Sequence, residues 1–286
     1  MPDFPKPTLQ CGRYRLTIDG DGFRPLVMGV LNVTPDSFSD GGQFNALELA
    51  ISHAEQMIAD GVDVIDIGGE STRPGAPPVS PEEELQRVMP VIYALRDCGK
   101  PLSVDTRRAL VMREALMAGA DMINDIEGFR DPASLAAVSD SDCAICIMHM
   151  QGQPQSMQQS PHYDDVLSEV REFLSAQVTE AEAAGITRDR ICIDPGYGFG
   201  KTVQHNLKLL AWQNELQNDL GLPLLAGLSR KSTIGHLTGK PVEQRMAGSV
   251  GAALVAAERG ARIIRVHDVA ETVDALKVWD AARRAR

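Results

Sequence analysis

Residues 27–42 read Val-Met-Gly-Val-Leu-Asn-Val-Thr-Pro-Asp-Ser-Phe-Ser-Asp-Gly-Gly. Residues 26–31 are apolar or glycine, which is typical of a strand buried on both faces. This run stops at Asn32, and a polar loop follows in which Phe38 is a lone large apolar side chain. A buried strand that delivers an amide to its carboxyl end, followed by a long polar loop, indicates one part of an active site.

The rest of the chain repeats this unit, because further short apolar runs follow and amphipathic helical stretches separate them. The predicted strands are residues 26–32, 62–67, 101–105, 121–126, 144–149, 190–194, 223–228 and 262–267. The predicted helices are residues 45–60, 81–97, 107–119, 132–139, 164–185, 204–219, 242–260 and 269–284. Each helix is long enough to cross over between parallel strands, so the pattern predicts an α/β protein, a single (β/α)8 TIM barrel.

We expect one domain over residues 1–286, with an N-terminal β-hairpin at 12–25 and the barrel at 26–286. Alternating residues and a turn at Asp19-Gly20-Asp21-Gly22 predict the hairpin, which should cap one end of the barrel. A doubly wound open sheet is the alternative, but it usually has fewer strands and a dinucleotide fingerprint, which is absent after the first strand. Polar residues 150–163 are predicted to form a long strand-to-helix loop on the site face.

Composition narrows the partners. A net charge of −11 argues against nucleic acid, which requires a basic face. No apolar run approaches the roughly 20 residues of a membrane span, and the first residues lack the pattern of a signal peptide. Five scattered cysteines are an odd number and fit reduced, mostly buried thiols, so we expect a cytoplasmic protein.

Polar residues stand at the carboxyl end of every predicted strand, where the active site of a barrel of this type is built. They include Asn32, Asp105, Asn124, His149, Asp194, the segment Ser229-Arg230-Lys231-Ser232, Arg265 and His267. Carboxylates and amides suit a flat heterocycle with N–H groups. Arg265 and His267 are two residues apart on one strand and fit a phosphate or pyrophosphate, although Arg265 could pair with a carboxylate and His267 could cap the following helix.

Two other patterns are weaker. Gly200-Lys201-Thr202 resembles the end of a P-loop, but Pro195 stands where that motif needs glycine, so Gly196-x-Gly198-x-Gly200 is predicted to be a close-approach loop. Asp66 and Glu70 could be a catalytic carboxylate pair or could be buried and anchor a loop.

Several of these motifs resemble dihydropteroate synthase, and the resemblance runs in order over residues 12 to 284. They are Asn-Val-Thr-Pro-Asp-Ser-Phe-Ser-Asp-Gly-Gly at 32–42, Asp-Ile-Gly-Gly-Glu-Ser-Thr-Arg-Pro-Gly at 66–75, Ser-Val-Asp-Thr at 103–106, Ile-Asn-Asp-Ile at 123–126, Asp-Pro-Gly-Tyr-Gly-Phe-Gly-Lys at 194–201, Gly-Leu-Ser-Arg-Lys-Ser at 227–232 and Arg-Val-His-Asp at 265–268. The resemblance implies a transferase of folate biosynthesis that joins 6-hydroxymethyl-7,8-dihydropterin pyrophosphate to p-aminobenzoate.

The resemblance also implies residue roles. Asp105, Asn124, Asp194 and Lys231 would bind the pterin, and Asp105, Lys231 and Arg265 would carry catalysis. Pyrophosphate would meet Asn32, Thr72, Arg73, Arg265 and His267, with Asn32 also binding Mg²⁺ as the cofactor. The p-aminobenzoate pocket, which sulfonamides also occupy, would contain Phe38, Pro74, Phe199 and Ser232. The family usually forms homodimers through its later helices, which we expect here.

The expected chemistry is largely electrostatic. Loss of pyrophosphate from a methylene on an electron-rich ring leaves a delocalised cation, which Asp105 and Asp194 favour while Arg265 and Mg²⁺ stabilise the departing charge. Two alternatives share the barrel: a pterin-binding methyltransferase, which would not need Arg265 and His267, and a catalytically silent paralogue, which would show damaged pyrophosphate-binding residues.

Overall fold

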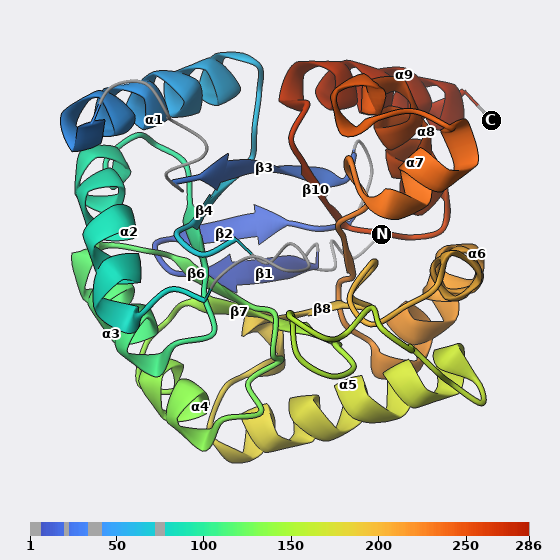
Figure 1. The fold of residues 1–286 in the computed structure, drawn as a ribbon, viewed down its shortest axis with the longest axis horizontal. Helices are drawn as coiled ribbons and strands as arrows, with labels where there is room; N and C mark the ends of the chain where they lie inside the picture. The colour runs from blue at the N-terminus through green and yellow to red at the C-terminus, as the bar shows by residue number, and fades with distance from the viewer. Residues whose placement is uncertain (1–6, 20–22, 34–41, 72–77, 286) are drawn as a thin grey trace, which may run out of the picture.

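The computed structural model describes residues 7–19, 23–33, 42–71 and 78–285. In these residues eight parallel strands form the wall of a barrel, and the helices lie outside it as a ring (Figure 1). The barrel strands are β3 (Leu26–Asn32), β4 (Val64–Gly68), β5 (Leu102–Asp105), β6 (Met122–Asp125), β7 (Ala144–Met148), β8 (Ile191–Asp194), β9 (Leu225–Ala226) and β10 (Ile263–Val266). The predicted fold class is confirmed, and each strand lies within or one residue beyond its predicted range.

The strand order is β8-β7-β6-β5-β4-β3-β10-β9, with every neighbouring pair parallel. The two ends of this row meet, since a bridge joins Ile193 of β8 to Leu224 just before β9, and the Ile193 N–H donates to Pro223 O at 3.0 Å. Closure therefore removes the free strand edges that an open sheet would leave.

The helices that follow the strands are α1 (Gly42–Ala59), α2 (Pro81–Leu95), α3 (Ala109–Ala118), α4 (Pro132–Val138), α5 (Val166–Ala183), α6 (Val203–Leu220), α7 (Ser232–Thr238), α8 (Met246–Glu258) and α9 (Val269–Arg284). Sequence signals fix several starts: Ser80 caps α2 by accepting from the Glu83 N–H at 3.2 Å, and Pro81 occupies the first turn. The helix α7 was not predicted, and the helix predicted at 242–260 begins only at Met246, after a short 3-10 turn over Val242–Gln244.

Two apolar layers hold the barrel. The larger one lies between the strands and the helix ring and includes Leu31, Ile67 and Leu276, all fully buried. The smaller one fills the barrel at the amino ends of the strands, where Met28, Val64, Met122, Ala144, Cys146, Cys192, Leu225 and Ile263 point inward. Leu9, Cys11 and Ile18 of the N-terminal segment pack on this second layer, so it closes that end of the barrel.

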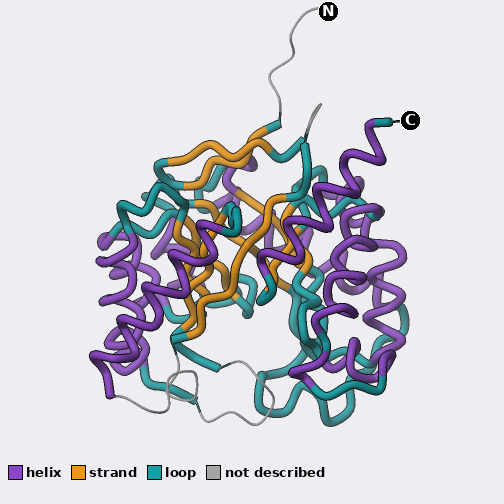
Figure 2. Tube along the Cα trace, turned by 90° about the horizontal axis from the view of Figure 1, so that it is seen from above, coloured by secondary structure: helices purple, strands orange, loops and turns teal. Residues whose placement is uncertain are grey.

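The N-terminal hairpin is real, but its predicted turn was wrong. The paired strands are β1 (Thr8–Cys11) and β2 (Tyr14–Thr17), and the chain turns at Gly12, whose φ of +54° suits glycine. Arg13 then fixes the turn to β6 by donating from Nε to Asp121 Oδ1 at 2.9 Å. The alternation begins before residue 11, and the Asp-Gly repeat that suggested a later turn runs into residues 20–22, outside the described residues. The hairpin does cap the amino end of the barrel, as expected (Figure 2).

No helix in the described part of the chain has both the length and the apolar character that crossing a membrane requires. The hairpin occupies the amino ends of the strands, so a ligand site is to be sought at their carboxyl ends.

Candidate active site

Arg265 on β10 connects the strand ends inside the barrel. Its Nε donates to Asp66 Oδ2 on β4 at 2.6 Å, and its Nη2 donates to Asp105 Oδ2 on β5 at 2.7 Å. Asn124 on β6 donates from Nδ2 to the same Asp66 oxygen at 3.3 Å. Side chains of four strands are thus joined in one hydrogen-bonded group, and of the two readings of Arg265 the described residues show the ion pair with carboxylates.

Burial and the neighbouring charges have opposite effects on the pKa values in this group. Burial raises the pKa of Asp105 to about 7, Arg265 opposes that rise, and Asp66 adds to it. Burial disfavours the charged Arg265 guanidinium, but Asp66 and Asp105 more than compensate and raise its pKa. One guanidinium therefore faces two carboxylates: burial holds the pKa of Asp105 above its ordinary value, and the two carboxylates keep Arg265 charged.

Two acceptors of this group lack donors. Asp66 Oδ1 and Asn124 Oδ1 are buried, and neither has a hydrogen-bond partner among the described residues. Buried acceptors without donors are costly, by roughly 1–3 kcal/mol each. A ligand that presents N–H groups to this edge would satisfy both, which suits the flat heterocycle expected from the sequence.

A second group lies at the end of β8 and in the following loop. Asp194 accepts from the Gly196 N–H at 2.7 Å, and burial raises its pKa. Lys231 donates from Nζ to Tyr197 O, and that Nζ lies 4.6 Å from the centre of the Phe199 ring. Burial lowers the pKa of Lys231 to about 8, while Asp194 opposes this change. Lys231 therefore keeps a charge that the neighbouring carboxylate supports.

Three more predicted residues lie nearby. Asn32 ends β3. A Cβ on Gly68 would lie 3.4 Å from Asn32 Oδ1 and 3.8 Å from Asp105 Cβ, so the side chains of Asn32 and Asp105 both lie beside Gly68. His267 follows β10, and its Nδ1 lies 3.1 Å from Ser229 Oγ. Ser232 is exposed at the first residue of α7.

The structure thus places Asn32, Asp105, Asn124, Asp194, Lys231, Arg265, His267, Phe199 and Ser232 at or just beyond the carboxyl ends of the strands. Phe38, Thr72, Arg73 and Pro74 lie outside the described residues. Asp66, whose role was open from the sequence, accepts hydrogen bonds from both Arg265 and Asn124. Its signal was a carboxylate between Ile65 and Ile67, in a strand whose other residues are apolar or glycine.

A layer of charge flanks the first group. Glu70 pairs with Arg107 at 3.0 Å, and Arg107 also pairs with Glu127 at 2.9 Å. Glu84 of α2 is buried beside this layer, and burial raises its pKa to about 7 against the opposing effects of Thr106 and the nearby arginines. Of the two roles considered for Glu70, the contacts show the anchoring one, since its Oε1 also accepts from the Val79 N–H at 3.3 Å.

Comparisons with known proteins agree on one family. The family described as pterin binding enzyme matches residues 28–267. Dihydropteroate synthase of Neisseria meningitidis serogroup B is 50% identical over 278 residues, which cover 95% of this chain and 96% of that protein. The crystal structure of Burkholderia cenocepacia dihydropteroate synthase with 7,8-dihydropteroate has a TM-score of 0.88 and 53% identity, and the match covers 99% of this chain and 98% of that one. The Yersinia pestis enzyme in a sulfonamide drug complex has a TM-score of 0.90 and 48% identity, with 98% and 100% covered.

The raised pKa of Glu84 has a consequence for stability. The folded state holds this proton up to a pH of about 7, whereas an unfolded glutamate loses it near 4.3, so the free energy of unfolding falls as the pH rises through this interval. Glu84→Gln removes the titration, and we expect the loss of stability between pH 5 and 7.5 to shrink by on the order of 2 kcal/mol. Urea unfolding across this pH range measures it. Glu82→Gln, exposed on the same helix, is the control, and equal pH profiles for the two variants would refute the assignment.

Proposed function

Because the chain belongs to the dihydropteroate synthase family of pterin-binding enzymes, we propose that it condenses 6-hydroxymethyl-7,8-dihydropterin pyrophosphate with p-aminobenzoate. The products are 7,8-dihydropteroate and pyrophosphate, so the enzyme is a transferase of folate biosynthesis. The observation that carries the proposal is the group formed by Arg265, Asp66, Asp105 and Asn124, since it combines a cation for a diphosphate with buried acceptors for a pterin.

The pterin would lie against the acceptor edge of the site. Asn124 offers a buried Oδ1 without a donor among the described residues, and the carboxylates of Asp105 and Asp194 stand at the ends of β5 and β8, three places apart in the strand order. Lys231 adds a donor on the side of Asp194. A ring with both N–H groups and ring nitrogens matches this mixture of acceptors and one donor, so these four residues would fix the pterin plane.

The diphosphate would lie against the cationic side. Arg265 can donate two parallel N–H bonds to a phosphate, and it already has its guanidinium oriented by Asp66 and Asp105. His267 follows on the same chain segment and would donate to the leaving group from the other side. As the C–O bond to pyrophosphate breaks, the electron pair leaves with the phosphate oxygen, and the guanidinium stabilises that charge.

The arylamine then attacks the methylene carbon and loses one proton. Asp105 and Asp194 favour the cationic pterin before the attack, because buried carboxylates interact strongly with a nearby positive charge. The p-aminobenzoate would pack on Phe199, with its carboxylate toward Ser232, and Phe38 and Pro74 are proposed for the same pocket. Thr72 and Arg73 are proposed to meet the pyrophosphate. A sulfonamide would compete for this pocket; the Yersinia pestis enzyme has been solved in a sulfonamide drug complex.

We propose Mg²⁺ as the cofactor and Asn32 as its protein ligand. In the part of the chain that the structure describes, no group of three His, Cys, Asp or Glu side chains could hold a metal. Mg²⁺ often binds through one or two protein oxygens together with substrate phosphates, so a single amide oxygen beside the diphosphate fits it. When bound, the ion would neutralise charge on the pyrophosphate.

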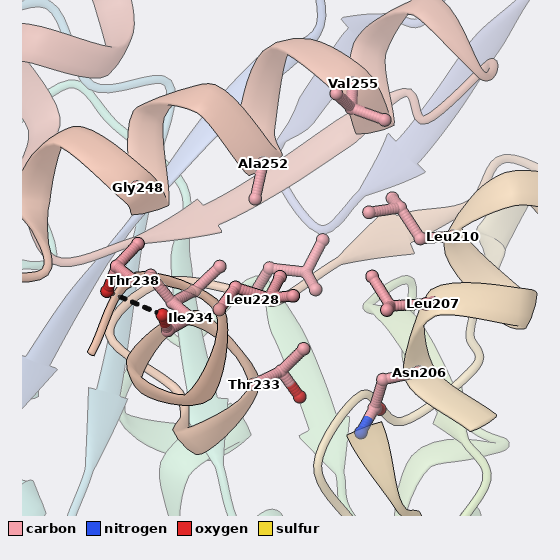
Figure 3. A pocket seen from close by; sticks show the side chains of 11 residues that line it. Asn206, Leu207, Leu210, Leu228, Thr233, Ile234, Thr238, Gly248, Ala252 and Val255 are labelled. Atoms are coloured by element: carbon pink, nitrogen blue, oxygen red, sulfur yellow. Dashed lines mark hydrogen bonds between the residues drawn. The ribbon is translucent and has the colours of Figure 1, made fainter. Parts of the chain in front are cut away.

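We propose that the protein forms a homodimer through α6, α7 and α8. A hollow of 310 Å³ lies between these helices, and its lining is almost wholly apolar (Figure 3). Leu207, Leu237 and Val255 line it and are 37%, 55% and 46% exposed. An apolar surface of this kind is typical of an interface, and the family forms dimers through its later helices. We also propose a cytoplasmic location, since all five cysteines are free thiols.

Turnover with the two substrates tests the function directly. We expect Arg265→Ala and Asp105→Ala each to lower kcat by about 100-fold, because each removes electrostatic stabilisation of the departing or developing charge. Arg262→Ala, at the amino end of the same strand, should turn over like the wild type. If both site variants keep near wild-type kcat, the electrostatic mechanism is wrong.

Calorimetry separates the synthase from the pterin-binding methyltransferase. A synthase binds p-aminobenzoate only with pyrophosphate present, whereas the methyltransferase does not bind p-aminobenzoate.

The Mg²⁺ site has its own test. Asn32→Ala should raise the Mg²⁺ concentration that gives half-maximal binding of pyrophosphate by about tenfold, because one amide oxygen of the coordination shell is lost. Calorimetric titration of pyrophosphate at several Mg²⁺ concentrations measures it. Asn214→Ala on α6 is the control, and identical Mg²⁺ curves for all three proteins would refute Asn32 as the ligand.

The dimer has a direct test as well. Val255→Asp places a charge in the apolar hollow and should convert the protein to a monomer in light scattering after gel filtration. Val278→Asp on α9, where valine is 71% exposed, should leave the molecular mass unchanged. A wild-type protein that is already monomeric at micromolar concentration would contradict the proposal.

A further inference from the structure

Lys201 is buried directly behind the second group of the site, with 3% of its surface exposed. Its Nζ lies 2.9 Å from His149 Nδ1, and it donates to the carbonyl oxygens of Gly196 at 3.0 Å, Phe199 at 3.0 Å and His149 at 3.3 Å. No carboxylate of the described residues forms a salt bridge with it. A lysine in such a place needs an explanation, because a buried amine without a carboxylate is unusual.

The four acceptors around the Lys201 Nζ indicate which protonation state of this lysine fits its surroundings. An ammonium has three N–H donors for these acceptors, whereas a neutral amine has two. Burial lowers the pKa of His149 to about 3, so its ring is neutral and Nδ1 can accept from Lys201. Burial also lowers the pKa of Lys201 itself, and Asp194 opposes this while Lys231 adds to it. The geometry favours the ammonium, because three carbonyl oxygens and one ring nitrogen surround the Nζ and offer acceptors to all three of its N–H donors.

Two of the carbonyls that Lys201 binds, those of Gly196 and Phe199, belong to one tight loop, and the third, that of His149, belongs to the segment that follows β7. Gly196 and Gly200 have φ values of +70° and +61°, in the region that glycine tolerates. A Cβ at Gly196 would lie 1.8 Å from His149 O, and one at Gly200 would lie 2.5 Å from Gln151 O. The loop is therefore pressed onto the segment that follows β7, and the ammonium joins the two.

The other side of the same loop contacts the site. Tyr197 O accepts from Lys231, the Phe199 ring lies over the Lys231 Nζ, and a Cβ at Gly198 would be 3.2 Å from Lys231 Cδ. The Gly196 N–H also holds Asp194. The loop thus contacts Asp194 through Gly196 and contacts Lys231 through Tyr197 and Phe199. Asp194, Lys231 and Phe199 are all proposed to meet the substrates.

We propose that Lys201 is a positioning residue whose ammonium holds the 196–200 loop in the shape that presents Phe199 to p-aminobenzoate and Tyr197 O to Lys231. The inference rests on the proposed function and extends it, because Lys201 would act on both substrates without touching either. The two effects differ in size. Asp194 is anchored in β8, whereas Phe199 depends on the loop alone, so a looser loop harms the p-aminobenzoate pocket more than the pterin site.

The experiment replaces the ammonium by an apolar group of similar length. Lys201→Met should raise the KM for p-aminobenzoate by at least about tenfold and the KM for the pterin pyrophosphate by less than about threefold, in steady-state assays on the full chain. Lys208→Met is the matched control, since Lys208 lies exposed on α6 and its partner among the described residues is Asp165. Its two KM values should equal those of the wild type.

A second variant decides the matter if Lys201→Met does not fold. The Tyr163 hydroxyl donates to Gly200 O at 2.9 Å, so Tyr163→Phe loosens the same loop by one hydrogen bond. It should raise the KM for p-aminobenzoate by about threefold. A lower melting temperature with both KM values within twofold of wild type, or an equal rise in both, would overturn the inference. Wild-type protein that turns over neither substrate would instead refute the proposed function.

Discussion

The ion pairs of Arg265 with Asp66 and Asp105 are the constraint on which the site depends. They cross the barrel interior, joining β10 to β4 and β5, and each partner is largely removed from water. Breaking such a buried pair leaves a charge without compensation, at a cost of about 3–5 kcal/mol. The barrel therefore holds these side chains in one arrangement before any ligand arrives, which is the preorganisation that electrostatic catalysis requires.

The same burial sets opposite tendencies in the acids and bases around it. It raises the pKa of Asp105 and Asp194 and lowers the pKa of Lys231, while the opposite charges pull each value back. The result is a site in which burial weakens the charged forms of the acids and of Lys231, whereas the guanidinium of Arg265 keeps its charge. A cationic ring intermediate would find carboxylates on one side, and its diphosphate would find a fixed cation on the other.

The barrel and most of its site residues could be predicted from the sequence, because each buried strand is short, apolar and ends on a polar side chain. Asp66 was harder, since it lies inside a strand and its partners Arg265 and Asn124 are far away in sequence. The hairpin turn was misplaced because Asp-Gly repeats favour turns strongly, whereas the actual turn depends on Arg13 reaching Asp121 across the fold. The helix α7 was missed because its seven residues carry too little periodicity to be seen.

The role of Lys201 could not be predicted from the sequence either. A lysine after a glycine-rich stretch resembles a phosphate-binding loop. That interpretation was rejected because Pro195 stands where the motif needs glycine. The structure gives the glycines and the lysine one joint reason: the glycines let the backbone approach His149 O and Gln151 O, and the approach brings the carbonyls to the ammonium. Sequence patterns report local geometry well, but the role of a buried charge is decided by which distant backbone atoms surround it. Here two of those atoms, the carbonyl oxygens of Gly196 and Phe199, belong to the loop that carries Tyr197 and Phe199 toward Lys231. The buried ammonium of Lys201 would therefore set the positions of the groups that meet the substrates, although it does not contact the substrates itself.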